Sequence, residues 1–259
     1  GGTGTCCHSF AMSKLSSLPD NLNVAVFGAS GAIGSEFVRQ LADDERVNRV
    51  HAYSRSPLEL PKGKIVTGTV DICDVASVNS AAAALEPGEK LDLVILATGI
   101  LHRGDAVQPE KSLRDIDPEA MTDLFSVNAI GPATVAKVFL PHMRGGSKTV
   151  FAALSARVGS IGDNRLGGWV SYRSSKAALN MILKTLAIEH ARRFPEAVIA
   201  GLHPGTVDSA LSAPFQRRVP DGKLFSPAQS VDYMLSVIDG LTAADTGGFF
   251  AWDGNSIDY

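Results

Sequence analysis

The stretch "VAVFGASGAIGSEFV", residues 24–38, runs from an apolar strand pattern through Gly28, Gly31 and Gly34 into an amphipathic helix pattern. Glycine at a tight strand-to-helix turn lets the backbone approach a pyrophosphate, and the helix N-terminus supplies free N–H groups and a partial positive charge. Ser30 can add a hydroxyl donor. The stretch therefore predicts a nucleotide-phosphate site. The alternative is that these glycines only let the helix pack closely on the strand.

Short apolar runs alternate with helix-like segments along the rest of the chain. The expected strands are residues 23–28, 49–54, 64–68, 91–98, 148–154, 197–203 and 247–252. The expected helices are residues 32–43, 75–85, 118–142, 169–193 and 227–239. Nearly continuous apolar strands indicate a sheet covered on both faces. The pattern predicts an α/β fold with a single doubly wound parallel sheet and helices on both faces. Two irregular stretches, 99–117 and 204–226, favour functional loops.

The length and composition are those of one domain. The chain has 259 residues, of which 45% are hydrophobic, and no linker or internal repeat divides it. We expect a domain over residues 21–259, preceded by a flexible N-terminal extension over residues 1–20. Met12 is one candidate for the native start.

The charge and the cysteine content limit the kinds of binding partner and the cellular compartment that we expect. A net charge of −3 without a dense basic run gives no reason to expect nucleic acid or an anionic membrane, so a small molecule is favoured. Cys6, Cys7 and Cys73 match neither a disulfide framework nor a metal-ligand spacing, which favours the reducing cytoplasm and no metal. No apolar run approaches the roughly 18 residues that span a bilayer. No GxSxG sequence indicates a hydrolase.

The end of the second expected strand carries Ser54 and Arg55, where an NAD site would be expected to carry Asp or Glu. A small hydroxyl followed by a guanidinium leaves room for a 2′-phosphate and can bind it. The pair favours NADPH over NADH. The alternative is that Arg55 is a solvated loop residue.

The stretch "SYRSSKAALN", residues 171–180, places Tyr172 and Lys176 on the stripe of the expected helix that also carries Leu179, Leu183 and Leu186. A lysine on an inward-facing stripe is costly unless it is paired or functional. A positive charge one turn from a phenol favours the phenolate. The pair is therefore a candidate for proton exchange with a carbonyl oxygen.

With these features in place, the chain resembles the short-chain dehydrogenases/reductases. It is most similar to their C-factor-like and sniffer-like carbonyl reductases, as judged by "FGASGAIG" (27–34), "SARVGSIGDNRLGGWVSYRSSKAALN" (155–180) and "GGFFAWDG" (247–254). The resemblance implies a Rossmann-type fold. It also implies that Tyr172 is the general acid/base, that Lys176 lowers its pKa and holds the nicotinamide ribose, and that Asn128 anchors a water of a proton relay.

The resemblance also implies a cofactor set. Asp71 would accept from the adenine amino group with Ile72 beside it, and the turn 204–206 would lie under the nicotinamide carboxamide. "LATG" stands where the family usually has "NNAG". The expected cofactor-binding residues are Gly28, Ser30, Gly31, Ile33, Gly34, Ser54, Arg55, Asp71, Ile72, Ala97, Thr98, Gly99, Tyr172, Lys176, Pro204, Gly205 and Thr206.

The family's substrate-polarising serine falls on Ala156 in this chain. Ser155 precedes that position and Ser160 follows Gly159, so the donor is Ser155, Ser160 or no serine. We favour Ser155, because it lies where the strand gives way to loop and its hydroxyl can turn toward the site.

The sequence as a whole predicts an NADP(H)-dependent oxidoreductase that reduces a small, apolar carbonyl compound, a ketone or an aldehyde. The alternative is a nucleotide-binding signalling or sensor protein of the same fold with little turnover. Residues 206–226 would form a mobile substrate lid. By analogy with the family, the helices 118–142 and 169–193 would make the contacts of a homodimer or homotetramer.

Overall fold

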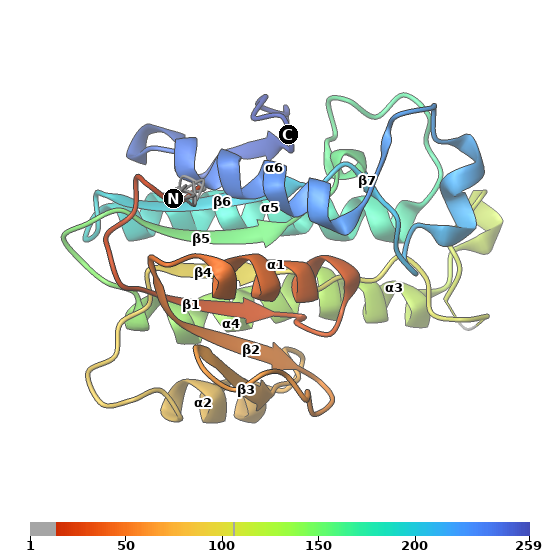
Figure 1. The fold of residues 1–259 in the computed structure, drawn as a ribbon. Helices are drawn as coiled ribbons and strands as arrows, with labels where there is room; N and C mark the ends of the chain where they lie inside the picture. Colours follow the sequence, from red (N-terminus) through yellow and green to blue (C-terminus); the bar gives the residue numbers. More distant parts are fainter. Residues whose placement is uncertain (1–13, 106) are drawn as a thin grey trace, which may run out of the picture.

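The computed structural model describes residues 14–105 and 107–259. Its central sheet has seven strands in the order β3-β2-β1-β4-β5-β6-β9 (Figure 1). They are β1 (Leu22–Phe27), β2 (Val47–Ser54), β3 (Ile65–Thr69), β4 (Leu93–Leu96), β5 (Thr149–Leu154), β6 (Ala197–His203) and β9 (Phe249–Ala251). Every neighbouring pair in this sheet is parallel, so all seven carboxyl ends lie at one edge.

Helices cover both faces of this sheet, which confirms the predicted doubly wound α/β fold. Side chains alternate along β1: Val24 and Val26 pack in one apolar core with α1 (Ala32–Asp43) and α6 (Pro227–Gly240). Ala25 and Phe27 point the other way, into a second core. The helices of that core are α2 (Val75–Ala83), α4 (Gly131–Phe139) and α5 (Val170–Ala191).

The expected helix 118–142 is continuous but changes its geometry. Asp117 caps the start of α3 (Pro118–Phe125), a π-helical turn follows at Ser126–Ile130, and α4 then runs into a 3₁₀ turn at Leu140–His142. Single π turns inside helices are frequent at functional sites. By length and composition, Pro118–His142 could cross a membrane, but half of its most apolar window is buried inside the molecule, as in the core helices of other folds.

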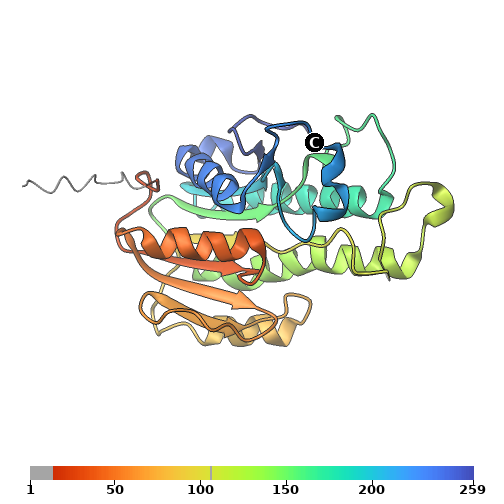
Figure 2. The same ribbon diagram turned by 45° about the vertical axis from the view of Figure 1, so that its right-hand side comes forward.

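The two predicted loops contain short elements that the sequence pattern did not indicate. β7 (Thr206–Val207) pairs with β8 (Leu224–Phe225), and a 3₁₀ helix, Ala213–Arg218, lies between them. The first loop contains a 3₁₀ turn at Leu113–Asp115, and two further 3₁₀ turns, Arg157–Gly159 and Ala243–Asp245, lie outside both loops. The loops after β4 and β6 lie beyond the end of the sheet toward which the strand arrows point (Figures 1 and 2).

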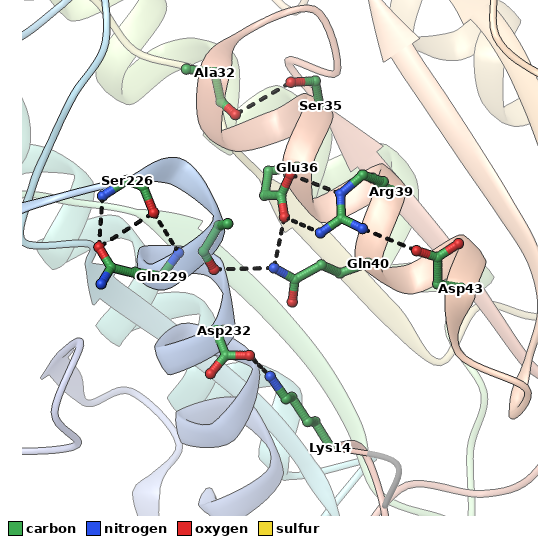
Figure 3. Close-up of polar contacts among 11 residues, drawn as sticks. Lys14, Ala32, Ser35, Glu36, Arg39, Gln40, Asp43, Ser226, Gln229 and Asp232 are labelled. Carbon is green, nitrogen blue, oxygen red and sulfur yellow. Dashed lines mark hydrogen bonds and ion pairs between the residues drawn. The ribbon is translucent and has the colours of Figure 1, made fainter. Parts of the chain in front are cut away.

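Residues 14–20 pack on the domain, although we expected them in a flexible extension. Leu15 and Leu18 are buried in the core between α1 and α6, and Ser17 donates its backbone N–H to Asp239 at 2.7 Å. Lys14 pairs with Asp232 of α6 (Figure 3). The ordered domain therefore begins no later than Lys14. Met12 and the rest of the expected extension lie outside the described residues.

A side-chain hydrogen bond links α1 to α6, beside polar contacts within each helix (Figure 3). Gln40 Nε2 donates to Glu36 at 2.8 Å and to the backbone oxygen of Ala228 at 3.1 Å. Ser226 and Gln229 form a capping box at the start of α6. The Gln40–Ala228 hydrogen bond thus joins α1, whose N-terminus faces the predicted phosphate site, to α6.

Candidate active site

The glycine turn between β1 and α1 is built as a phosphate site requires. Gly28 has φ +83°, and a Cβ on Gly34 would lie 2.0 Å from the backbone oxygen of Gly28. Gly31 is the N-cap of α1, with no side-chain cap and no acidic residue in the first turn. Ser30 is exposed beside it, and Ile33 packs against the core. The N–H groups of this helix end therefore remain open to an anion.

Ser54 and Arg55 follow β2 at the same edge of the sheet. Ser54 is buried and donates its hydroxyl to the backbone oxygen of Ser56, so it shapes the loop. Arg55 is exposed. The guanidinium is thus accessible at the position where a 2′-phosphate is expected.

The ends of β3 and β4 complete this side of the site. The Asp71 carboxylate accepts the backbone N–H of Cys73 at 2.9 Å, and Ile72 is buried against the start of α4 beside Gly131. After β4, Thr98 has a buried hydroxyl oxygen without a hydrogen-bond partner in the described part of the chain. Ala97 contacts Gly28, since a Cβ there would meet the Ala97 oxygen at 2.7 Å.

Tyr172 and Lys176 lie one turn apart on α5, and both are buried, with 8% and 3% of their surfaces exposed. Lys176 Nζ donates to the backbone oxygen of Leu154 at 2.9 Å and lies 5.9 Å from the centre of the Tyr172 ring. Burial lowers the pKa of Lys176 to about 8 and raises the pKa of Tyr172. At neutral pH the structure therefore holds a charged lysine beside a neutral phenol.

The expectation that Lys176 lowers the pKa of Tyr172 stays a prediction. Burial raises the pKa of Tyr172, because the phenolate would lose its hydration inside the protein. A neutral phenol is the form that donates a proton.

Asn128 lies on the π-helical turn and is fully buried. Its Oδ1 accepts the N–H of Ile100 at 2.9 Å, and its Nδ2 donates to the Ile100 oxygen at 2.8 Å and to Ser175 Oγ at 3.1 Å. A Cβ on Gly99 would lie 3.2 Å from Lys176 Nζ and 3.4 Å from Asn128 Oδ1. The structure thus brings Asn128, Gly99 and Lys176 together. The role of Asn128 in holding a water stays a prediction.

The serines near the end of β5 are engaged elsewhere. Ser155 Oγ donates to Asn180 Oδ1 at 2.7 Å, and Ser160 Oγ accepts the N–H of Asp163 at 3.1 Å. Ala156 instead packs in the apolar cluster that contains Tyr172. The role of Ser155 in polarising a substrate stays a prediction, and its observed partner is Asn180.

The turn 204–206 follows β6 at the same edge. The Pro204 oxygen accepts from Ser230 Oγ at 2.7 Å, and Gly205 has φ +77°. Phe225 and Trp252 pack beneath Gly205, where a Cβ would clash with Phe225. Thr206 begins β7. The neighbouring His203 is neutral at pH 7, because burial and the Arg157 cation lower its pKa to about 4.

Several residues around Tyr172 escaped the sequence reasoning. Trp169, Leu211 and Phe215 pack in its cluster, and Glu110 bonds to Ser171 from the loop after β4. The only signal in the sequence was that both irregular stretches lie where loops after parallel strands meet. No group of three or more His, Cys, Asp or Glu side chains arranged for a metal occurs in residues 14–105 and 107–259.

The chain matches a known protein family over most of its length. A family model described as short chain dehydrogenase matches residues 22–219, which include the glycine turn, Asn128, Tyr172 and Lys176. The chain belongs to the short-chain dehydrogenase family. It is therefore an NAD(P)-dependent oxidoreductase.

Individual members of the short-chain dehydrogenase family match over most of the chain. The 1-hydroxy-2-glutathionyl-2-methyl-3-butene dehydrogenase of Rhodococcus sp. (strain AD45) is 30% identical over 238 residues, covering 91% of this chain and 99% of that protein. The C-signal protein of Myxococcus xanthus is 37% identical over 147 residues, covering 56% of this chain and 82% of that protein.

Among solved structures, the NADPH-bound carbonyl reductase from chicken fatty liver has a TM-score of 0.79 and 26% identity, covering 95% of this chain and 98% of that chain. The carbonyl reductase Sniffer of D. melanogaster has a TM-score of 0.78 and 19% identity, with coverage of 93% and 100%, which shows the shared fold.

The residues of this short-chain dehydrogenase fit a dinucleotide. The space at Gly34 excludes any Cβ, the end of α1 leaves its N–H groups open, and the orphaned Thr98 hydroxyl lies in the segment that contacts Gly28. A pyrophosphate group suits an open helix N-terminus bordered by glycine.

Proposed function

We propose that the protein reduces a small carbonyl compound, a ketone or an aldehyde with apolar substituents, with NADPH as cofactor. The main support for this proposal is that Tyr172, Lys176, Asn128 and Gly99 lie together at the sheet edge that also bears the glycine turn. Bound reduced nicotinamide would supply the hydride.

The chain's own residues would manage the proton. The neutral Tyr172 phenol donates its proton to the carbonyl oxygen as negative charge develops there. Lys176 holds a positive charge beneath the ring, which stabilises the phenolate that remains. Leu154 fixes the ammonium group in place, and Asn128 fixes the segment at Ile100 against α5. In this proposal, Asn128 also anchors the water that returns a proton to the site.

The proposed cofactor contacts follow the order of the strands. Gly28, Ser30, Gly31, Ile33 and Gly34 would surround the pyrophosphate. Asp71 and Ile72 would bind the adenine. The remaining contacts would come from Ala97, Thr98, Gly99, Tyr172, Lys176, Pro204, Gly205 and Thr206 around the nicotinamide ribose and ring.

The preference for NADPH would come from Arg55, with Ser54 leaving space for the 2′-phosphate. Arg55 is exposed and accessible to an anion, and the similar chicken protein was solved with NADPH. Changing Arg55→Ala should lower the ratio of kcat/KM for NADPH over NADH by about 10- to 100-fold, the loss of a charge-assisted contact. Equal affinities for the two cofactors in the parent protein, measured by calorimetry, would rule out this role.

The substrate preference follows from the cluster around Tyr172. Leu101, Ala156, Trp169, Leu211 and Phe215 surround the phenol with apolar groups. Such surroundings favour apolar substituents on the carbonyl carbon.

The test of the proposed function is NADPH oxidation, followed at 340 nm, against a panel of apolar ketones and aldehydes. Tyr172→Phe should reduce turnover by at least about 10²-fold, the usual contribution of a positioned acid. It should still bind NADPH, because the glycine turn is intact. Cofactor binding without turnover of any carbonyl by the parent protein would disprove the proposed carbonyl reduction.

That negative outcome would support the second candidate, a nucleotide-binding signalling or sensor protein. Two observations favour it: Ala156 stands where the family has its polarising serine, and the C-signal protein is similar over 147 residues. The buried Tyr172 and Lys176 favour the enzyme, since a binding protein has no use for that costly lysine.

We further propose that the protein is cytoplasmic and that it forms a homodimer or a homotetramer. Ile130, Met181 and Ile188 are 57%, 66% and 54% exposed near or on helices α4 and α5, and a second copy would cover them. Light scattering should show a dimer or tetramer that Met181→Asp weakens. A monomeric parent protein would contradict the proposal.

A further inference from the structure

The segment before α5 adopts an unusual backbone. Gly167, Gly168 and Trp169 have φ values of +64°, +69° and +54°, so three successive residues are left-handed. Among the described residues that are not glycine, only Asn21 shares this property with Trp169. A left-handed L-residue costs about 1–2 kcal/mol and persists where surrounding contacts impose it.

Glu110 provides the first set of these contacts. Its backbone oxygen accepts the N–H of Trp169 at 2.8 Å, and its carboxylate accepts the N–H of Ser171 at 3.3 Å from both oxygens. The Ser171 hydroxyl also donates to this carboxylate. Glu110 is 5% exposed. It therefore caps the start of α5 from the loop after β4, a task that Trp169 at the N-cap does not perform.

Arg173 provides the second set of contacts. Its Nε donates to the Gly168 oxygen at 2.9 Å, and its Nη2 donates to the Gly167 oxygen at 3.1 Å. Its Nη1 reaches the Val158 oxygen at 3.3 Å. The left-handed turn is thus bonded from the loop after β4 and from α5 itself, and the segment after β5 holds Arg173 in place.

The result of this bonding is the placement of one indole. The Trp169 ring lies 6.4 Å from the Tyr172 ring and 5.1 Å from the Phe215 ring, centre to centre and edge-on in both cases. The same cluster contains Ala156. Trp169 therefore stands between the proposed proton donor and the loop after β6.

We propose that Trp169 is the specificity-determining wall of the substrate site, and that Glu110 is the positioning residue that holds it, with Arg173, beside Tyr172. This proposal rests on the proposed carbonyl reduction. An indole wall beside Phe215 favours carbonyl compounds with a flat aromatic substituent, which can stack on it, over short aliphatic ones.

Glu110→Ala and Glu110→Gln form a matched pair. Alanine removes both acceptors of the Ser171 N–H, whereas glutamine keeps one. We expect Glu110→Ala to lower kcat for an aromatic aldehyde by about 10-fold or more, with the NADPH dissociation constant unchanged, and Glu110→Gln to recover most of that loss. Thr242→Ala removes the cap of the 3₁₀ turn Ala243–Asp245 and should leave kcat unchanged.

A merely structural role of Trp169 would leave the substrate specificity unchanged, so specificity is the quantity to measure. Trp169→Leu should lower the ratio of kcat/KM for benzaldehyde over propanal by about 10-fold, while Trp169→Phe should largely keep it. An unchanged ratio in Trp169→Leu would overturn the wall. Equal kcat in Glu110→Ala and the parent protein would overturn the positioning role.

A spectroscopic test separates this proposal from the reductase function. The chain has two tryptophans, Trp169 and Trp252, so Trp252→Phe leaves Trp169 as the single reporter. Adding Glu110→Ala should shift its emission to longer wavelength as the indole leaves the cluster, and Glu110→Gln should not. An unchanged spectrum would overturn the positioning role even in a protein without turnover. If Glu110→Ala does not fold, Arg173→Met in the same background should give the shift, and its absence would overturn the proposal.

Discussion

The chemistry of the site depends on Lys176, a buried lysine that is charged at neutral pH. The Lys176 ammonium has the Leu154 oxygen as its acceptor and the Tyr172 ring nearby, and burial lowers its pKa from 10.5 to about 8. The unfolded chain therefore binds more protons between pH 8 and 10.5. Below pH 8, the buried charge of Lys176 lowers the free energy of unfolding. This loss is regained as the pH rises from about 8 to 10.5.

The activity should follow the same titration in the opposite direction. We expect kcat/KM for carbonyl reduction to fall as pH rises through about 8, because Lys176 then loses the charge that supports Tyr172. A pH profile of NADPH oxidation measures this. Lys184→Gln, an exposed change on the same helix, should keep the profile. A flat profile from pH 7 to 9.5 would contradict the role of Lys176.

Ala156 offers the opposite experiment, a gain of function. Its side chain packs in the Tyr172 cluster, while the Ser155 hydroxyl bonds to Asn180. Ala156→Ser should therefore raise kcat by up to about 10²- to 10³-fold, because one donor to a developing oxyanion contributes on this scale. Ser155→Ala is the matched comparison. A larger effect from Ser155→Ala than from Ala156→Ser would identify Ser155 as the polarising donor.

At the scale of elements, the β1–α1 turn shows how a local sequence builds a site. The turn closes because Gly28 takes a positive φ and Gly34 lets the helix approach the Gly28 oxygen. The resulting helix end has no side-chain cap. The same close packing thus stabilises the fold and leaves N–H groups free for a phosphate.

Gly34→Ala tests this dependence. A Cβ 2.0 Å from a backbone oxygen forces the turn apart, so we expect loss of NADPH binding by at least about 10²-fold together with lowered stability. Calorimetry and thermal unfolding measure the two effects. Gly240→Ala is the control, since nothing lies near its Cβ position. Normal NADPH affinity in Gly34→Ala would exclude this turn as the cofactor site.

Periodicity predicted the regular elements well. Residues 32–43 and 197–203 coincide with α1 and β6, and the other strands shift by a few residues. The π-helical turn at Asn128 was not predicted, because a single extra residue in a helix leaves the apolar pattern almost unchanged. The β7–β8 pair was missed because two-residue strands carry no period.

At the scale of the whole molecule, an ion pair between a buried carboxylate and a partly exposed guanidinium joins segments of the sheet. Asp92, just before β4, accepts from Arg144 Nε at 2.6 Å and from the backbone N–H of Asn23 at 3.0 Å. Its side chain is fully buried. Asp92 thus joins the starts of β1 and β4 to the segment before β5.

Asp92→Ala should lower the free energy of unfolding by about 1–3 kcal/mol, because it leaves the Asn23 N–H without its buried acceptor, whereas water can solvate the partly exposed Arg144. Urea unfolding measures this loss. Asp43→Ala removes an exposed pair with Arg39 and should cost less than about 1 kcal/mol (Figure 3). Equal losses in the two variants would show that the Asp92 pair does not stabilise the sheet.

The sequence by itself determined the doubly wound fold, the glycine turn and the placement of Tyr172 and Lys176 on one stripe, because each depends on spacing between near neighbours. Only the tertiary structure decided that Ala156 packs in the Tyr172 cluster, that Lys176 has a lowered pKa, and that Glu110 caps α5 from 61 residues away. These properties depend on burial and on contacts between distant segments, which no local pattern encodes.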